Sequence, residues 1–143
     1  MAAESVVIAG RLPAKMVGSG RGAFAIVDDE PELISIYSHI VKSLGFDPIF
    51  IATEGEEIVR AIADGRASPG VIIMDYRLPG MNGIEAAKMI LADRPTIKVI
   101  IASADESVRE EALSLGFSFL QKPFSMAAFG DKIRVISQSP PGP

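Results

Sequence analysis

The stretch VIIMDYRLPGMNG, residues 71–83, puts an aspartate directly after an apolar run and follows it with a loop that holds one proline and two glycines. Four consecutive apolar residues predict a strand buried on both faces, as in a parallel sheet covered by helices. In open sheets of this kind, sites form just beyond the carboxyl ends of the strands. Asp75 therefore occupies a position where a functional group is expected, and the residues that follow the other strands become important.

The same pattern recurs along the chain. Each of five apolar runs is followed by a segment with apolar residues at helical spacing, as where Leu33, Tyr37, Ile40 and Leu44 recur every three or four residues. This alternation predicts an α/β fold, with a parallel sheet between two layers of helices. The predicted strands are 23–27, 48–52, 70–74, 97–102 and 117–121, and the predicted helices are 33–44, 56–63, 84–91, 108–115 and 129–136.

The two ends of the chain depart from this pattern. Residues 1–21 are rich in glycine and show no sustained periodicity, so we expect a flexible leader there. Residues 138–143 are expected to form a disordered tail, because three of the last four residues are prolines, which cannot continue a helix. The predicted folded unit is residues 22–137, a single domain.

The composition excludes several classes of protein. With 143 residues, 48% of them hydrophobic, the chain is long enough for one domain with a sizeable core. The formal net charge of −4 and the lack of a basic cluster argue against direct nucleic-acid binding. The absence of cysteine excludes disulfides and thiolate chemistry, and no apolar stretch approaches the roughly 18 residues of a membrane span. We expect a soluble, cytoplasmic protein that does not bind membranes.

Polar residues follow four of the five predicted strands. Asp28 and Asp29 follow the first, Asp75 the third, Ser103 the fourth and Lys122 the fifth. Because parallel strands end at the same edge of a sheet, these side chains should converge. Crowded carboxylates need a cation or raised pKa values to coexist, and Mg²⁺ takes oxygen ligands of this kind. An aspartate can also act as a nucleophile toward a phosphoryl group, so the set predicts a phospho-acceptor site with Mg²⁺.

Four segments together resemble the receiver domain of two-component response regulators, with single-domain chemotaxis regulators as the nearest type. They are IVDDEP, VIIMDYRLPGMNG, IIASA and FLQKPF, in that order, and the resemblance extends from residue 24 to about residue 136. Each segment alone is weak, whereas all four in order, each at a strand end, are specific. The resemblance implies a flavodoxin-like (βα)5 doubly wound parallel sheet with strand order 2-1-3-4-5.

The resemblance also implies the roles of the acidic residues. Asp75 matches the aspartate that is phosphorylated, and Asp28 and Asp29 match the acid pair that binds Mg²⁺. Asp29 would ligate the ion directly and Asp28 mainly through water. The backbone carbonyl of Arg77 matches a further metal ligand.

Ser103 and Lys122 match the hydroxyl and ammonium groups of the family's site, and Pro123 is often preceded by a cis peptide there. Ser103 and Phe119 match the two switch positions. Since Phe119 has no hydroxyl, we expect any switching of this ring to work by packing alone.

The implied function is that of a phosphoprotein in signal transduction. A histidine kinase or a phosphotransfer protein would donate a phosphoryl group to Asp75, giving an aspartyl phosphate, in a direct pathway or a phosphorelay. Phosphorylation would change the binding of a downstream effector protein, or of a second copy in a homodimer, at a face formed by residues 104–136. We do not expect an enzyme, apart from catalysis of its own phosphorylation and dephosphorylation.

Two charged residues are expected to flank the mouth of the site. Arg77 lies two residues after Asp75, and Asp105 lies two residues after Ser103. We hypothesise that they pair across the site and slow the loss of the phosphoryl group by hindering the attacking water. Alternatively, Arg77 points into solvent, since exposed ion pairs are weak.

Other interpretations remain open at this stage. The chain could be a pseudo-receiver that binds partners without being phosphorylated, or a receiver excised from a larger regulator or hybrid kinase. A phosphohydrolase of the haloacid type is disfavoured, because Arg77 stands where such enzymes carry an aspartate. Taken singly, the acids suit a helix N-terminus or a turn, Lys122 a solvated surface and Phe119 the core.

Overall fold

The computed structural model describes residues 22–138, so the predicted leader and residues 139–143 lie outside the described part. Its five strands form one parallel sheet in the order β2-β1-β3-β4-β5, which confirms the predicted doubly wound, flavodoxin-like fold. The strands are β1 (Phe24–Val27), β2 (Ile49–Ala52), β3 (Val71–Asp75), β4 (Lys98–Ser103) and β5 (Ser118–Gln121).

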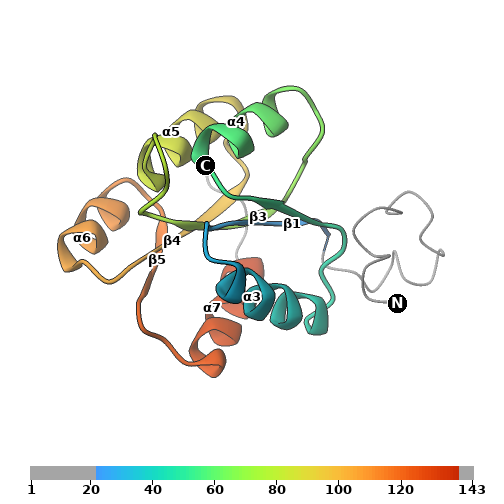
Figure 1. Cartoon of the computed structure of the whole chain (residues 1–143), viewed down its shortest axis with the longest axis vertical. Helices are drawn as coiled ribbons and strands as arrows, with labels where there is room; N and C mark the ends of the chain where they lie inside the picture. Colours follow the sequence, from blue (N-terminus) through green and yellow to red (C-terminus); the bar gives the residue numbers. More distant parts are fainter. Residues whose placement is uncertain (1–21, 139–143) are drawn as a thin grey trace.

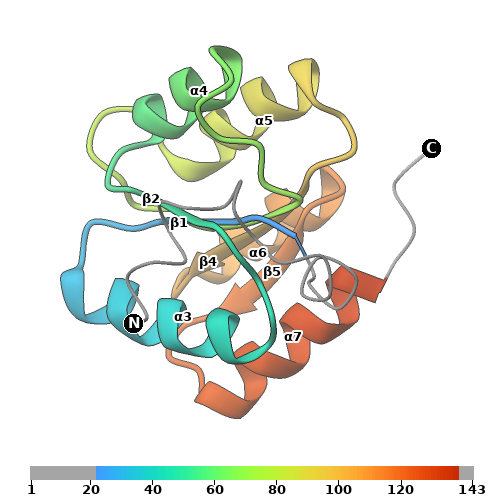
Figure 2. The ribbon, with the colours of Figure 1, turned by 90° about the vertical axis from the view of Figure 1, so that its right-hand side faces the viewer.

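Helices cover both faces of this sheet. In Figures 1 and 2, α4 and α5 lie over one face, whereas α3 and α7 lie over the other, and α6 packs beside β4 and β5. The helix α7 includes Gln138, which the predicted boundary assigned to the tail. The helices are α3 (Pro31–Ser43), α4 (Gly55–Ala63), α5 (Gly83–Asp93), α6 (Glu106–Ser114) and α7 (Met126–Gln138).

The sheet separates two apolar cores. All five residues of β3 are buried, and they alternate between the cores: Ile72 and Met74 pack with residues of α4, α5 and α6, whereas Val71 and Ile73 pack with residues of α3 and α7. This alternation follows from the two-residue period of a strand. Burial on both faces explains the continuous apolar run in the sequence.

The start of α5 is fixed by a capping box. The Asn82 side chain accepts a hydrogen bond from the Glu85 backbone N–H at 2.9 Å, and the Glu85 carboxylate accepts one from the Asn82 N–H at 2.9 Å. These bonds satisfy backbone groups that the first helical turn leaves unpaired. The loop after Asp75 therefore ends at a defined point, next to the carboxyl edge of the sheet.

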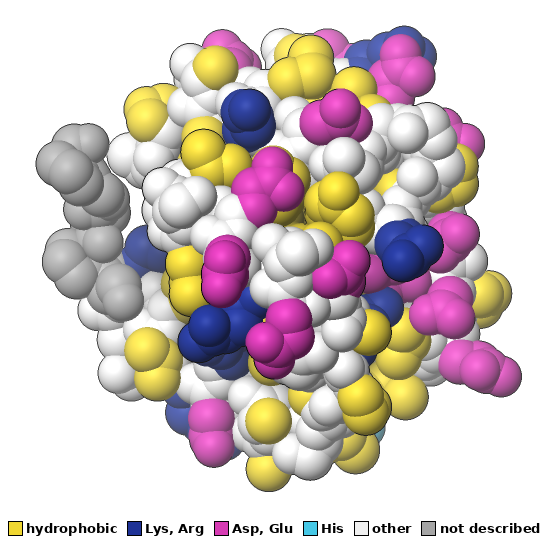
Figure 3. Space-filling view, turned by 90° about the vertical axis from the view of Figure 1, so that its left-hand side faces the viewer, with side chains coloured by type: hydrophobic (Ala, Val, Ile, Leu, Met, Phe, Trp, Pro, Cys, Tyr) yellow, Lys and Arg dark blue, Asp and Glu magenta, His cyan; other side chains and the backbone are white. Residues whose placement is uncertain are grey.

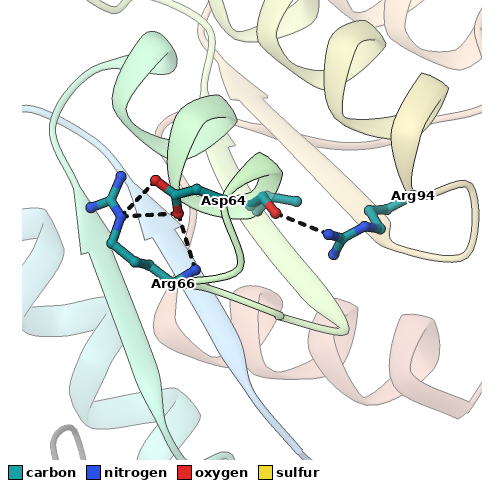
Figure 4. A network of polar contacts seen from close by, with 4 residues as sticks. Asp64, Arg66 and Arg94 are labelled. Atoms are coloured by element: carbon teal, nitrogen blue, oxygen red, sulfur yellow. Dashed lines mark hydrogen bonds and ion pairs between the residues drawn. The ribbon is translucent and has the colours of Figure 1, made fainter.

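The opposite edge of the sheet carries a separate set of polar contacts. Arg94, which follows α5, donates a hydrogen bond at 3.1 Å to the carbonyl of Ile62 in the last turn of α4, and Arg66 pairs with Asp64 at 3.0 Å (Figure 4). Arg94 thus ties the end of α4 to the end of α5. None of the helices in residues 22–138 is long and apolar enough to cross a membrane.

Candidate functional site

The carboxyl edge of the sheet brings together the residues that the sequence singled out. Asp75 and Ser103 are the last residues of β3 and β4, Asp28 and Asp29 directly follow β1, and Lys122 directly follows β5. The strands run from right to left in Figure 1, so Figure 3 looks onto this edge, where acidic side chains gather near the middle of the face. The predicted convergence is therefore present.

Three carboxylates form the centre of the site. Asp28, Asp29 and Asp75 each offer one oxygen, and these oxygens all lie within 4.8 Å of one another. Asp28 is fully buried and Asp75 is 7% exposed, whereas Asp29 reaches solvent. Such a set suits a hard divalent cation, which takes carboxylate oxygens and keeps water or phosphate oxygens in its remaining positions.

Lys122 supplies positive charge to this cluster. Its Nζ donates a hydrogen bond to Asp75 Oδ1 at 3.0 Å and lies 3.8 Å from Asp28 Oδ2. The lysine is therefore anchored by the predicted acceptor and close to one of the predicted metal ligands. One ammonium group against three carboxylates leaves the site with excess negative charge.

The pKa values of the two buried acids are raised mainly by their burial. Burial raises the pKa of Asp28 from 3.8 to about 6; the hydrogen bond from the Glu30 N–H opposes the rise, and the charge of Asp75 adds to it. Burial also raises the pKa of Asp75, against the hydrogen bond and charge of Lys122. A bound cation or a proton would relieve this cost.

The backbone around Asp75 is held closely by the loop that follows. The Tyr76 N–H donates to the Ala102 carbonyl and the Gly83 N–H to the Tyr76 carbonyl, both at 2.9 Å. A Cβ atom at position 83 would collide with the Asp75 carbonyl oxygen, so glycine is required there. The loop thus returns to the end of β3, and Arg77 lies within it with an exposed side chain.

Ser103 and Lys122 lie on neighbouring strand ends. The Lys122 N–H donates to the Ser103 carbonyl at 2.9 Å, and the Ser103 hydroxyl accepts from the Asp105 N–H at 3.1 Å. The Lys122–Pro123 peptide is cis, as the resemblance implies. The Lys122 side chain reaches the acid cluster, whereas the Ser103 hydroxyl is bonded to the Asp105 N–H; the chemical roles of both stay predictions.

The hypothesis that Arg77 pairs with Asp105 is wrong for this structure. No ion pair joins these two described residues, and Asp105 Oδ1 caps α6, accepting from the N–H of Ser107 at 2.9 Å and from its hydroxyl at 2.8 Å. These bonds lower the pKa of Asp105, and the charge of Arg77 adds a smaller effect in the same direction. The influence of Arg77 on phosphoryl lifetime stays a prediction.

Phe119 lies in β5 with only 6% of its surface exposed, and it packs in the same core as Val108 and Ala112 of α6. The ring is thus placed where a movement of α6 would change its surroundings. Its switching role stays a prediction.

One residue near the site was not singled out from the sequence. Tyr37 appears there only as a member of an apolar helical stripe, yet its hydroxyl is buried. Burial raises the pKa of this phenol, and the charges of Asp28, Asp75 and Glu30 add to the rise. The one available signal is that a phenol carries a polar atom into a core position.

Comparisons with known proteins agree with this geometry. A family described as the response regulator receiver domain matches residues 24–134. A protein-glutamate methylesterase/protein-glutamine glutaminase of Haloarcula marismortui is 39% identical over 102 residues, which are 68% of this chain and 27% of that protein. The chemotaxis protein CheY of Thermotoga maritima is 30% identical over 116 residues, covering 79% of this chain and 95% of that protein.

A solved structure of a receiver domain is also similar to this chain. The receiver domain of a sensor histidine kinase from Pseudomonas aeruginosa, with a magnesium ion coordinated in its active-site cleft, has a TM-score of 0.70 and 26% identity. The match covers 82% of this chain and 98% of that domain. By contrast, the chain spans only about a quarter of the length of the methylesterase relatives, with coverage of 27% and 22%.

Proposed function

The chain belongs to the response regulator receiver domain family of two-component signalling, and from this membership we propose that it is a phospho-acceptor whose Asp75 takes a phosphoryl group from a phosphohistidine. The donor would be a histidine kinase or a phosphotransfer protein. One Asp75 oxygen forms the new bond to phosphorus while the bond from phosphorus to the donor imidazole nitrogen breaks, and the imidazole leaves with that electron pair.

The observation that carries this proposal is the Asp75–Lys122 contact beside two further carboxylates. The 3.0 Å hydrogen bond to Lys122 Nζ leaves the other oxygen of Asp75 as the candidate nucleophile. The ammonium group is also positioned to neutralise charge on the phosphoryl oxygens, which is a main requirement of phosphoryl transfer. Ser103, on the neighbouring strand end, would donate a hydrogen bond to a phosphoryl oxygen.

The acid cluster fits Mg²⁺, because it offers three oxygens within 4.8 Å and a net negative charge. Asp28, Asp29, Asp75 and the backbone carbonyl of Arg77 would hold the ion. When bound, it supplies positive charge to the acceptor and to the phosphoryl oxygens.

Partner switching would follow from the placement of Ser103 beside α6. Its hydroxyl accepts from the Asp105 N–H, and Asp105 in turn caps α6. A Ser103 side chain drawn toward a new phosphoryl group would give up this bond and loosen the start of the helix. The affected face, formed by α6, β5 and α7, would bind a downstream effector protein or a second copy of the chain. Because Phe119 packs in the same core as residues of α6, its ring would move with that helix.

The activities of longer relatives belong to those proteins. Methylesterase and glutaminase activity are named for proteins of which this chain spans about a quarter. We infer here only self-catalysed phosphorylation and dephosphorylation. A pseudo-receiver is disfavoured, because the chain carries Asp28, Asp29, Asp75, Ser103 and Lys122, the residue types that phosphorylation of a receiver would need.

Intact mass after incubation with acetyl phosphate tests the proposal. We expect the wild type to gain one phosphoryl group only when Mg²⁺ is present, and Asp75→Asn to gain none under the same conditions. Asp64→Asn is a suitable control, since Asp64 is exposed and lies at the opposite edge of the sheet. If the wild type stays unmodified with acetyl phosphate and with phosphorylated histidine kinases, the chain is a pseudo-receiver.

A further inference from the structure

Gln121, the last residue of β5, bonds to the loop that joins β4 to α6. Its Nε2 donates hydrogen bonds to the Ala104 carbonyl at 3.0 Å and to the Lys122 carbonyl at 3.2 Å. Ala104 directly follows Ser103 in the chain, and Lys122 directly follows Gln121. One half-buried side-chain amide therefore joins the two strand ends that carry the hydroxyl and the ammonium group of the candidate site.

The chemistry of the two partners fixes the orientation of this amide. Both partners are backbone carbonyl oxygens, which only accept hydrogen bonds. The amide nitrogen of Gln121 carries two hydrogens and can donate to both carbonyls, whereas the amide oxygen cannot donate at all. The position therefore requires a donor, and a side chain of similar length without N–H groups would leave the Ala104 carbonyl without this bond.

The contact continues the pairing of β4 with β5 beyond the ends of both strands. Ser103 lies opposite Gln121 in the parallel register, and the Lys122 N–H donates to the Ser103 carbonyl at 2.9 Å. The next carbonyl along the chain, that of Ala104, accepts from the Gln121 side chain. The first residue of the loop is thus attached to β5 by a side chain, in continuation of the backbone ladder.

The peptide group between Ala104 and Asp105 is held on both sides. Its carbonyl accepts from Gln121 Nε2 at 3.0 Å, and its N–H donates to the Ser103 hydroxyl at 3.1 Å. A Ser103 hydroxyl that shifts toward a phosphoryl group on Asp75 must either lose the bond from this N–H or draw the peptide along with it. Drawing the peptide along breaks the bond from Gln121, so one hydrogen bond is lost in both cases.

We propose that Gln121 is a positioning residue for Ser103, because its amide holds the Ala104–Asp105 peptide in place and so opposes the shift of the Ser103 hydroxyl toward a phosphoryl group on Asp75. Its two bonds go to backbone carbonyls, so it acts through the loop and not on the reacting atoms. The inference rests on the proposed function in one respect, that Ser103 binds the phosphoryl group. Loss of the amide should therefore strengthen phosphoryl binding, since the peptide can then follow Ser103.

The first test is the binding of beryllofluoride, an anion that mimics a phosphoryl group on aspartate, to Gln121→Met at saturating Mg²⁺. Methionine keeps the length of the side chain and removes both N–H donors. We expect the variant to bind the anion about threefold to tenfold more tightly than the wild type, as measured by ¹⁹F NMR, the size expected for one net hydrogen bond. The affinity for Mg²⁺ alone should stay within about twofold, whereas a damaged fold would weaken both.

Amide hydrogen exchange provides a second readout that needs no ligand. With its peptide held on one side only, the Asp105 N–H should exchange about threefold to tenfold faster in Gln121→Met than in the wild type. The Gly83 N–H, bonded to the Tyr76 carbonyl in a different loop, should exchange at an unchanged rate. Gln138→Met is the matched control, since the chain's other glutamine is exposed at the end of α7.

Beryllofluoride affinity in Gln121→Met that equals or falls below that of the wild type would overturn the inference, and so would unchanged exchange of the Asp105 N–H. Equal strengthening in Gln138→Met would overturn it as well. In each of these cases, anion binding by the wild type leaves the proposed function intact. If instead the wild type binds beryllofluoride no better than Asp75→Asn does, the proposed phospho-acceptor site fails, and the role of Gln121 fails with it.

Discussion

The Asp28 carboxylate is buried, accepts one hydrogen bond from the Glu30 N–H, and lies 3.8 Å from Lys122 Nζ. Its fold-imposed pKa of about 6, against 3.8 for an ordinary aspartate, means that the folded protein binds its proton more tightly than the unfolded chain does. The stability that Asp28 contributes is therefore fully present below about pH 4 and is lost as the pH rises through about 6. Near neutral pH without a cation, this residue destabilises the fold.

We predict that Asp28→Asn raises the free energy of unfolding at pH 8 by about 1–3 kcal/mol, in buffer freed of divalent cations. The neutral amide removes the buried charge that costs this energy. Urea titrations at several pH values would measure it, and the advantage of the variant should shrink as the pH falls from about 6 toward 3.8. If Asp28→Asn were less stable than the wild type by the same amount at pH 8 and at pH 4, the buried charge of Asp28 would not be what destabilises the fold.

At the scale of one element, the start of α5 is packed against the backbone of β3. Gly83 is the first residue of α5, and a methyl group there would meet the Asp75 carbonyl oxygen and lie 3.0 Å from Met74 Cγ. Replacing glycine by alanine inside a helix normally stabilises it, by about 1 kcal/mol. Here the clash with the Asp75 backbone should make the substitution destabilising instead.

We predict that Gly83→Ala lowers the free energy of unfolding by about 1–3 kcal/mol, the usual cost of overpacking. It should also slow phosphorylation, because the Asp75 backbone must move to admit the methyl group. Gly70→Ala is the control, since its new Cβ would find only the Ala23 carbonyl oxygen, at 4.0 Å. The clash would be refuted if both variants were equally stable in a denaturant titration.

At the scale of the whole molecule, the acid cluster links cation binding to global stability. The cluster draws its ligands from the two residues after β1 and from the last residue of β3, so only the folded chain presents all of them together. A ligand that binds only the folded state stabilises it by mass action. Thermal unfolding can therefore report occupancy of the site without any phosphoryl donor.

We predict that Mg²⁺ at a concentration one hundred times its dissociation constant adds about 2.7 kcal/mol to the free energy of unfolding. The melting temperature of the wild type should rise saturably with Mg²⁺ and return to its starting value with EDTA. Asp29→Asn, which removes an exposed ligand at little structural cost, should abolish the rise. A rise of equal size in that variant would mean that Mg²⁺ acts elsewhere.

Much of the fold and the site is predictable from the sequence, for a physical reason. Strands buried on both faces appear as continuous apolar runs, and parallel strands end at one edge, so Asp28, Asp75, Ser103 and Lys122 could be grouped without coordinates. The strand order and the cis peptide before Pro123 followed from the family resemblance and are confirmed.

What the sequence could not supply are contacts decided by side-chain direction. The sequence left open whether Arg77 pairs with Asp105 or points into solvent, and in the structure Arg77 is exposed while Asp105 caps α6. Likewise, spacing places Tyr37 on the buried side of α3, but no pattern shows that its hydroxyl lacks a hydrogen-bond partner among the described residues. Such details depend on packing across elements distant in sequence.

The separation of the core by the sheet has a consequence for how such a protein can change over generations. Ile90 and Val99 belong to one layer, Ile40 and Phe129 to the other, and β3 contributes alternate residues to each. Substitutions far apart with no shared contacts combine additively, whereas those in contact do not. Epistasis should therefore be concentrated within a layer, so that substitutions under α6 and substitutions under α7 combine almost independently, although both helices belong to the proposed partner face.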